Sequence, residues 1–215
     1  MIDFSKYSHI IWDWNGTLLN DAWLCVDVMN GMLQERNLRL LTLDDYRSVF
    51  DFPVKDYYVK IGFDFNKEAF EKVGMEFMIR YNLRQKESSL HPEVVDVLKA
   101  FKDKGYRQFI LSAREQNELI REIHELGVFH YFDHICGLDD HYAHGKTDVG
   151  LEMVRKLNLP TDQLIFIGDT LHDAEVAAEI AIECALIPNG HNSRERLEAS
   201  NLPIISSLKD LTGLI

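Results

Sequence analysis

The sequence HIIWDWNGT, residues 9–17, decides the fold class. Its first four residues have the length and the β-branched and aromatic content of a buried strand. Asp13 follows directly, and Asn15 and Gly16 are residues typical of a turn. In an open parallel sheet, ligands bind at the carboxyl ends of the strands. A polar residue just past a buried strand is therefore a candidate functional residue, and Asp13 is the first of them.

Four later runs have the same strand-like character, and amphipathic segments with a helical period lie between most of them. The runs are residues 107–111, 134–136, 164–167 and 184–187. Strands that alternate with helices predict a parallel sheet covered on both faces. We therefore expect an α/β fold with a doubly wound, mostly parallel sheet, that is, a Rossmann-like core.

The alternation is interrupted once, after the first strand, because residues 13–106 are far too many for one crossover. Four features there indicate helices: amphipathic periods at residues 21–37 and 66–82, a helix start at Thr42-x-x-Asp45, and Pro53 ahead of a further helix. We expect a catalytic core formed by residues 1–19 and 86–215, with an inserted all-helical cap at residues 20–85.

The composition narrows the functional class. Hydrophobic residues make up 46% of the 215 residues and charged residues 27%, so the chain can bury a core and is not a disordered or fibrous protein. The formal net charge of −12 repels nucleic acids and anionic membranes, and we expect neither as a partner. The same charge repels an anionic substrate unless local cations reverse the field at the site.

The cysteines and the apolar runs indicate in which cellular compartment the protein works. Cys25, Cys136 and Cys184 form no C-x-x-C pair, which favours a reducing environment over a disulfide framework or a zinc site. Residues 1–14 lack the pattern of a signal peptide, and no apolar run approaches the ~18–20 residues that span a bilayer. We expect a cytoplasmic protein, either a monomer or a small homo-oligomer.

Polar residues follow other predicted strands as well. Ser112 comes after the second strand, the hexapeptide GDTLHD at residues 168–173 after the fourth, and Lys146 opens a predicted helix between the third and the fourth. Each has an ordinary structural explanation when taken alone: a turn or cap for an aspartate, an N-cap for Ser112, an exposed position for Lys146. The order in which they occur is more specific than any one of them.

That order resembles the haloacid dehalogenase superfamily of phosphatases and phosphotransferases. Its motifs are D-x-D-G-[TV], a Ser or Thr after a strand, a Lys, and G-D-x-x-x-D, matched here by residues 13–17, Ser112, Lys146 and residues 168–173. The helical insertion is similar to the cap of the phosphoglycolate phosphatase-like branch. Two departures are Asn15 in place of the second aspartate, and Thr147-Asp148 where that branch commonly has proline.

The resemblance implies a phosphatase that acts on a small phosphorylated metabolite through an aspartyl-phosphate, with Asp13 as the nucleophile. It also implies Mg²⁺, held by the carboxylates of Asp13 and Asp169 and by the backbone carbonyl of Asn15, because magnesium prefers oxygen ligands. Asp173 would orient Lys146 or a water of the metal.

The remaining oxygens of the phosphate would be held by a second group of residues. By the resemblance these are Lys146, Ser112 and the backbone N–H groups of Trp14, Gly16 and Thr17. The metal and Lys146 together would supply the local positive field that an acidic protein otherwise lacks.

Asn15 leaves the proton chemistry open. Relatives with aspartate at this position use its carboxyl group as a general acid and base. An amide cannot transfer a proton in this way, and general acid–base catalysis is typically worth ~10²–10⁴-fold in rate. The enzyme is then slow, acts on esters with good leaving groups, or uses another acid. His172 and His191 are the candidates for that acid, unless they are solvated loop histidines.

The sequence is also compatible with two rival functions. One is a phosphotransferase such as a sugar phosphomutase, which returns its phosphoryl group to a product. The other is a low-turnover member that binds phosphate or metal, which Asn15 favours and the retained Asp13, Lys146, Asp169 and Asp173 oppose. Aromatic residues between positions 50 and 65 are expected mostly as cap core, with one or two closing over the substrate.

Overall fold

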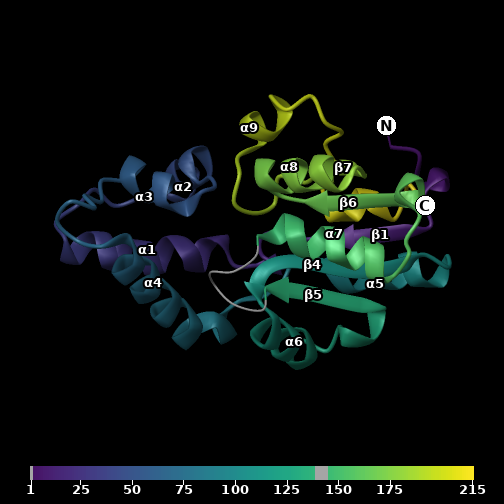
Figure 1. Ribbon diagram of the computed structural model, residues 1–215, viewed down its shortest axis with the longest axis horizontal. Helices are drawn as coiled ribbons and strands as arrows, with labels where there is room; N and C mark the ends of the chain where they lie inside the picture. The colour runs from purple at the N-terminus through teal and green to yellow at the C-terminus, as the bar shows by residue number, and fades with distance from the viewer. Residues whose placement is uncertain (1, 139–144) are drawn as a thin grey trace.

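The computed structural model describes residues 2–138 and 145–215. Five parallel strands form the central sheet in the order β5-β4-β1-β6-β7 (Figure 1). They are β1 (His9–Trp12), β4 (Arg107–Glu115), β5 (His134–Leu138), β6 (Leu164–Gly168) and β7 (Glu183–Leu186). Each corresponds to a predicted strand, so the predicted doubly wound parallel sheet is confirmed.

Helices cover both faces of this sheet. One face carries α5 (Val94–Asp103), α6 (Gln116–Glu125) and α10 (Leu208–Leu211), and the other carries α7 (Lys146–Lys156), α8 (Leu171–Ile180) and α9 (Arg194–Glu198). In β1, Ile10 and Trp12 belong to the first core and Ile11 to the second, because successive strand side chains point to opposite faces. A strand buried on both faces has no polar alternation, which is why residues 9–12 form a continuous buried run.

Four helices occupy the interval after β1. They are α1 (Ala22–Glu35), α2 (Leu43–Val49), α3 (Val54–Lys60) and α4 (Phe70–Arg84), called here the helical segment. The chain enters through β2 (Leu19–Asn20) and leaves through β3 (Ser89–Leu90), which pair with each other antiparallel. The helical segment has a hydrophobic core of its own, formed by residues between positions 22 and 81. The division of the chain at residues 20 and 85 stays a prediction.

The details of the helical segment follow local chemistry. Thr42 and Asp45 form the capping box that begins α2, and Pro53 directly precedes α3, both as predicted. Helix α4 begins at Phe70 rather than near residue 66, because Asp64 accepts a hydrogen bond from the Asn66 backbone N–H and holds a turn there.

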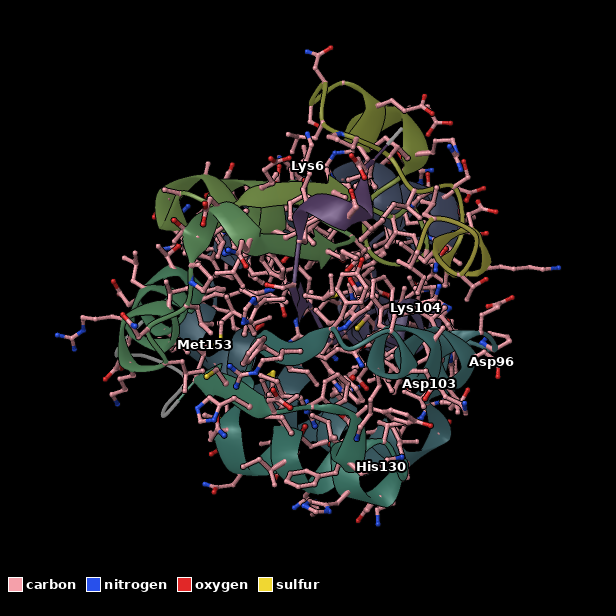
Figure 2. The ribbon with its side chains drawn as sticks, turned by 90° about the vertical axis from the view of Figure 1, so that its right-hand side faces the viewer. Lys6, Asp96, Asp103, Lys104, His130 and Met153 are labelled. Carbon is pink, nitrogen blue, oxygen red and sulfur yellow. The ribbon has the colours of Figure 1, made fainter. Side chains whose placement is uncertain are left out.

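The carboxyl ends of the sheet strands face the helical segment (Figure 1). Figure 2 shows the opposite end of the molecule, where exposed charged side chains such as Lys6, Asp96, Asp103 and Lys104 surround the sheet. The polar residues predicted at the strand ends therefore lie between the sheet and the helical segment. Within the described ranges, no helix combines the length and apolar content of a membrane span.

Candidate active site

The turn after β1 is folded tightly against the end of β6. The Asp13 N–H donates to the Ile167 carbonyl at 2.9 Å, which continues the contact between the two strands. Gly16 has a φ of +81°, and a Cβ added there would lie 2.4 Å from Oδ2 of Asp169. Only glycine adopts this positive φ readily and has no Cβ to clash with Asp169. Gly16 thus lets the turn approach the carboxylate of Asp169.

Lys146 connects two of the predicted aspartates. Its Nζ lies 2.5 Å from Oδ1 of Asp13 and 2.6 Å from Oδ1 of Asp173, and all three side chains are buried. Lys146 is the first residue of α7, as predicted, and is not an exposed surface lysine. The charges offset one another in a site that water does not screen.

Asp173 has a second role besides its contact with Lys146. Its Oδ2 accepts hydrogen bonds from the backbone N–H and the hydroxyl of Thr170 and from the backbone N–H of Asp169, at 2.7–3.1 Å. These bonds complete a capping box at the start of α8. Gly168 is needed beside it, because a Cβ there would lie 2.5 Å from the Asp173 side chain. Helix capping therefore fixes the position of the carboxylate that contacts Lys146.

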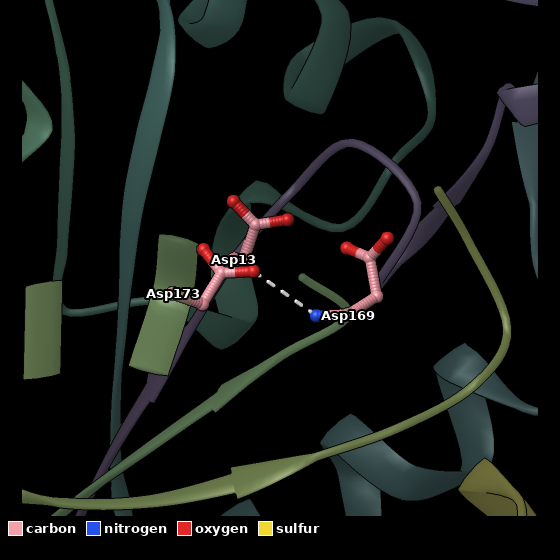
Figure 3. Close-up of side chains that lie close together, drawn as sticks. All are labelled: Asp13, Asp169 and Asp173. Carbon is pink, nitrogen blue, oxygen red and sulfur yellow. Dashed lines mark hydrogen bonds between the residues drawn. The ribbon is translucent and has the colours of Figure 1, made fainter. Parts of the chain in front are cut away.

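Asp169 is fully buried. Its Oδ1 accepts the Thr17 hydroxyl at 2.8 Å and its Oδ2 accepts the backbone N–H of His191 at 2.6 Å. Figure 3 shows its position beside Asp13 and Asp173; one carboxylate oxygen from each of the three lies within 4.8 Å of the others. The strand-end aspartates predicted from separate motifs therefore form one cluster.

The cluster has more negative than positive charge. Burial raises the pKa of Asp13 well above its usual value, and burial raises the pKa of Asp169 to about 6. Burial acts on Asp173 too, but the charge of Lys146 outweighs it and keeps the pKa of Asp173 low. The two carboxylates also outweigh burial at Lys146 and raise its pKa. One ammonium among three carboxylates leaves room for a further cation.

Asp21 is a site residue that the sequence analysis missed. It is buried, and its carboxylate accepts hydrogen bonds from the Asn15 side-chain amide at 2.8 Å, the Gly16 N–H at 2.9 Å and the Tyr81 hydroxyl at 2.7 Å. The sequence shows only an aspartate ahead of a helix, which indicates an N-cap, yet its side chain makes no capping hydrogen bond. Asn15 and Gly16 lie close to it in sequence but Tyr81 is 60 residues away, so no local pattern reveals this set of contacts.

His191 faces this carboxylate. Its Nε2 lies 3.5 Å from Oδ1 of Asp21 and its Nδ1 lies 2.8 Å from the Tyr46 hydroxyl. Burial alone would lower the pKa of His191, but Asp21 outweighs burial and raises it to about 9. The same pairing holds the pKa of Asp21 below its usual value in spite of burial. His191 is therefore a buried, protonated histidine at neutral pH and not a solvated loop residue.

One cavity of about 430 Å³ gathers most of the predicted residues. Its lining includes Asp13, Asn15, Ser112, Lys146, His172, Asp173 and His191. Ser112 lies inside β4, not after it, because the strand continues to Glu115 beyond a register shift; its hydroxyl accepts the Arg114 N–H at 3.1 Å. His172 is only partly buried, and its ring stacks on Phe52 with centroids 4.4 Å apart.

Four predicted residues are buried near the cavity without belonging to its lining: Asp169, Trp14, Gly16 and Thr17. The Gly16 N–H, expected to face phosphate, donates to the Leu19 carbonyl and to Asp21 instead. Phosphate binding by the Gly16 backbone stays a prediction, and it would require this N–H to change partners. The indole of Trp14 donates to Glu122 at 2.8 Å, and phosphate contacts by the backbone of Trp14 and Thr17 stay predictions.

Comparison with known proteins identifies the class to which this fold and this site belong. Residues 10–187 match the haloacid dehalogenase-like hydrolase family, and the chain belongs to that family. The predicted resemblance is thereby confirmed.

Individual relatives are more distant. The chain is 26% identical over 175 residues to the pyrophosphatase PpaX of Listeria innocua, covering 79% of this chain and 78% of that protein. It is 23% identical over 209 residues to a phosphoglycolate phosphatase of Rhodobacter capsulatus, covering 95% and 94%. A haloacid dehalogenase-like hydrolase from Streptococcus pneumoniae has the same fold, with a TM-score of 0.83, 20% identity, and coverage of 97% and 98%.

Proposed function

We propose that the protein is a magnesium-dependent phosphatase that hydrolyses a small phosphorylated metabolite through an aspartyl-phosphate. The observation that carries this proposal is the buried contact of Lys146 with Asp13 and Asp173 at the wall of a cavity. The relatives named as phosphoglycolate phosphatase and pyrophosphatase support it, since both names describe hydrolysis at phosphorus.

Asp13 is the proposed nucleophile. A carboxylate oxygen of Asp13 forms a bond to phosphorus while the bond from phosphorus to the ester oxygen breaks, and the leaving oxygen takes the electron pair. Water then attacks the phosphorus of the aspartyl-phosphate and releases inorganic phosphate and free Asp13. Lys146 and the Ser112 hydroxyl hold the other phosphate oxygens, and Asp173 positions Lys146.

The residues present fit a magnesium ion. Asp13 and Asp169 offer carboxylate oxygens in a cluster whose negative charge exceeds that of one ammonium, and magnesium prefers such hard oxygen donors. The backbone carbonyl of Asn15 is the third proposed ligand. When bound, the ion supplies positive charge that offsets the charge of the phosphate oxygens.

The source of the leaving-group proton stays a proposal. Asn15 directs its amide toward Asp21, and an amide donates no proton to an alkoxide at neutral pH. His172 and His191 both line the cavity, so either is within the space available to substrate. For an ester with a poor leaving group, one of these two histidines would have to supply the proton, whereas an ester whose leaving group departs as a stable anion needs neither.

The test is hydrolysis of a panel of phosphorylated metabolites with added Mg²⁺. We expect Asp13→Asn to lower turnover by about 10³-fold or more while circular dichroism stays unchanged, because removing a nucleophile abolishes the covalent route. We expect Asp169→Asn to weaken magnesium binding, and EDTA to stop the wild type. Full activity of Asp13→Asn would exclude this mechanism.

Product analysis separates the two transfer chemistries. A phosphatase releases inorganic phosphate from every substrate, whereas a phosphotransferase such as a phosphomutase returns the group to an acceptor hydroxyl. Phosphate-binding without turnover would show as saturable binding of inorganic phosphate with no product from any ester.

A further inference from the structure

The part of the cavity contributed by the helical segment is aromatic and apolar. It is lined by Phe50, Phe52, Tyr57, Tyr58, Phe77 and Met78, among others. The Phe50 and Tyr57 rings pack edge to face with centroids 5.2 Å apart, and Tyr46 packs edge to face on Tyr57 at 5.7 Å. Such packing holds the rings in fixed positions. The phosphate-binding end is polar, but the other end is a preformed apolar wall.

The cavity is also larger than a small phosphate needs. Its volume of about 430 Å³ lies within the range of about 300–1,000 Å³ that is typical of sites for small organic ligands. A substrate that filled it would carry a ring-sized organic group beyond its phosphate. Burying such a group is favourable by about 25 cal/mol per Å² of apolar surface.

The charged lining residues disfavour a second anionic group on the substrate. Among the described residues of the lining, four side chains carry or can carry positive charge, and each faces a carboxylate. Lys146 contacts Asp13 and Asp173, and His191 faces Asp21.

The other two cationic side chains of the lining, Arg114 and His172, also lie next to carboxylates. Arg114 forms a buried ion pair with Glu122 at 3.3 Å and a partly exposed one with Glu118 at 3.8 Å, and His172 lies 3.3 Å from Glu175. Glu71 adds a negative charge to the lining. A second carboxylate or phosphate on the substrate would therefore enter an acidic and apolar space without a free cation among these four.

A buried hydroxyl in this wall has no partner. Tyr57 is 1% exposed, and its hydroxyl makes no hydrogen bond to any described residue. An unpaired buried hydroxyl costs free energy unless a ligand or a water pairs with it. Tyr57 lines the cavity, and its enclosed hydroxyl becomes an uncharged hydrogen-bonding position for a ligand when neighbouring side chains shift.

The polar end of the site independently favours esters with an acidic leaving group. Asn15 supplies no proton to the leaving oxygen, which favours esters whose leaving group departs as a stable anion. A phenol has a pKa of about 10, as tyrosine does, whereas an alkyl alcohol is closer to water at 15.7. A phenolate therefore leaves with its electron pair and without prior protonation, and takes its proton from solvent afterwards.

We propose that the substrates of this site are aryl phosphates, with an uncharged aromatic ring seated among the rings of the helical segment and a polar substituent of the ring paired with Tyr57. This inference rests on the proposed phosphatase function. It excludes phosphoglycolate and pyrophosphate as preferred substrates, although relatives carry those names.

The first experiment separates the ring from the leaving group. Hydrolysis is compared for phenyl phosphate, benzyl phosphate, acetyl phosphate and ethyl phosphate, with phosphoglycolate and pyrophosphate included. Benzyl phosphate has the ring without an acidic leaving group, and acetyl phosphate has the acidic leaving group without the ring. We expect KM to be about 10-fold lower or more with a ring, since burying an aromatic side chain is worth about 1.5–3 kcal/mol. We expect kcat to follow the acidity of the leaving group.

Binding is measured without turnover as well. Calorimetry with benzylphosphonate and ethylphosphonate, which are not hydrolysed, should give about 10-fold tighter binding for the compound with the ring. Equal affinities, or faster hydrolysis of phosphoglycolate or pyrophosphate than of phenyl phosphate, would overturn the aryl assignment and leave the phosphatase function standing. If no ester shows Asp13-dependent hydrolysis, the phosphatase function itself is wrong.

Two variants test the wall. Met78→Gln replaces an apolar lining residue by a polar one of similar length, and should raise the KM of phenyl phosphate about 5-fold or more and that of acetyl phosphate by less. Ile79→Gln, on the same helix but exposed and outside the lining, is the matched control and should change neither. Equal effects of the two variants would contradict the proposal.

Tyr57→Phe tests the hydroxyl. Of the three isomeric hydroxyphenyl phosphates, at least one should bind about 2–10-fold more tightly than phenyl phosphate, because a neutral hydrogen bond contributes about 0.5–1.5 kcal/mol. Tyr57→Phe should abolish that gain, so that the variant binds the hydroxyphenyl phosphate no more tightly than it binds phenyl phosphate. If no isomer gains affinity in the wild type, the assignment of Tyr57 is wrong.

Discussion

Lys146 is the one ammonium in the aspartate cluster, and it contacts two carboxylates at 2.5 and 2.6 Å. Removing it leaves Asp13 and Asp173 buried and facing each other without a cation. The same charge is proposed to hold phosphate. A single substitution at this residue should therefore affect both stability and activity.

We predict that Lys146→Met destabilises the protein by about 3–5 kcal/mol, the usual cost of breaking a buried ion pair. The rate of phosphate-ester hydrolysis should fall by about 10²–10³-fold. Urea unfolding and initial rates measure the two effects. Lys156→Met, at an exposed position of the same helix, is the control and should stay within about 0.5 kcal/mol of the wild type. A Lys146 variant no different from this control would contradict the charge assignment.

Asn15 is also explained at the scale of single residues. Its amide donates to Asp21 at 2.8 Å, so an aspartate here would place a partly buried carboxylate in contact with the buried carboxylate of Asp21. Two such groups share a proton, and the pKa of the pair rises above that of an isolated carboxyl. The position therefore suits an amide as long as Asp21 is present.

We predict that Asn15→Asp lowers the free energy of unfolding at pH 7 and recovers part of it toward pH 5. The folded pair then binds a proton that the unfolded chain, with lower carboxyl pKa values, releases. The double variant Asn15→Asp with Asp21→Asn exchanges the two groups and should restore stability at pH 7. Urea titrations at both pH values test this, with mass analysis to exclude deamidation of Asn15. A single variant as stable as the wild type at pH 7 would show that the two groups do not interact.

At the scale of elements, α7 positions Lys146 by packing closely on its neighbours. Gly150 lies in this helix, and a Cβ there would be 2.4 Å from Cδ1 of Ile180 in α8 and 2.8 Å from Cδ2 of Leu111 in β4. Glycine is a poor helix former, so close approach is the reason for it here.

We predict that Gly150→Ala destabilises the protein by about 1–3 kcal/mol through overpacking, although alanine favours a helix. If α7 shifts to relieve the contact, activity should fall as well, because Lys146 is its first residue. Gly31→Ala, inside α1, is the matched control: the nearest atom would lie 3.6 Å from its Cβ, so the variant should be more stable by up to about 1 kcal/mol. Thermal unfolding of both variants tests the opposite signs.

The elements also show what the sequence could predict. The strands were predictable because each contains a short apolar run. The runs of β1 and β6 are buried along their whole length, and the aspartates after them follow from that placement. The extent of β4 past Ser112 was not, since its last residues include the polar Arg114 and Glu115, whose environment is set by tertiary contacts. Asp21 could not be found either, because Tyr81 and His191 reach it from 60 and 170 residues away along the chain.

At the scale of the whole molecule, an excess of 12 negative charges surrounds a site proposed to bind an anion. The buried groups at the site add to the negative charge, since the cluster has three aspartates and Lys146 contacts two of them. Protonation of His191 offsets part of the charge. The stability of the metal-free protein should therefore depend on pH well above the range in which ordinary carboxylates titrate.

The protonation of His191 makes the stability of the protein depend on pH. His191 has a folded-state pKa of about 9 against 6.5 in the unfolded chain, so its stabilising effect is complete below pH 6.5 and is lost as pH rises through 9. At about 1.4 kcal/mol per pH unit, the loss is about 3 kcal/mol. Asp169 acts in the same direction at lower pH: burial raises its pKa to about 6, so stability falls as it ionises between about pH 4 and 6. Urea unfolding in EDTA from pH 4 to 9 should show both declines. The raised pKa of Asp13 acts in the same direction, so His191→Gln should reduce the decline above pH 6.5 and keep the one below pH 6. Magnesium should stabilise the wild type more at pH 7 than at pH 5, because protons compete for the Asp169 carboxylate at the lower pH. A flat profile above pH 6.5 in the wild type would mean that His191 is not held protonated by Asp21.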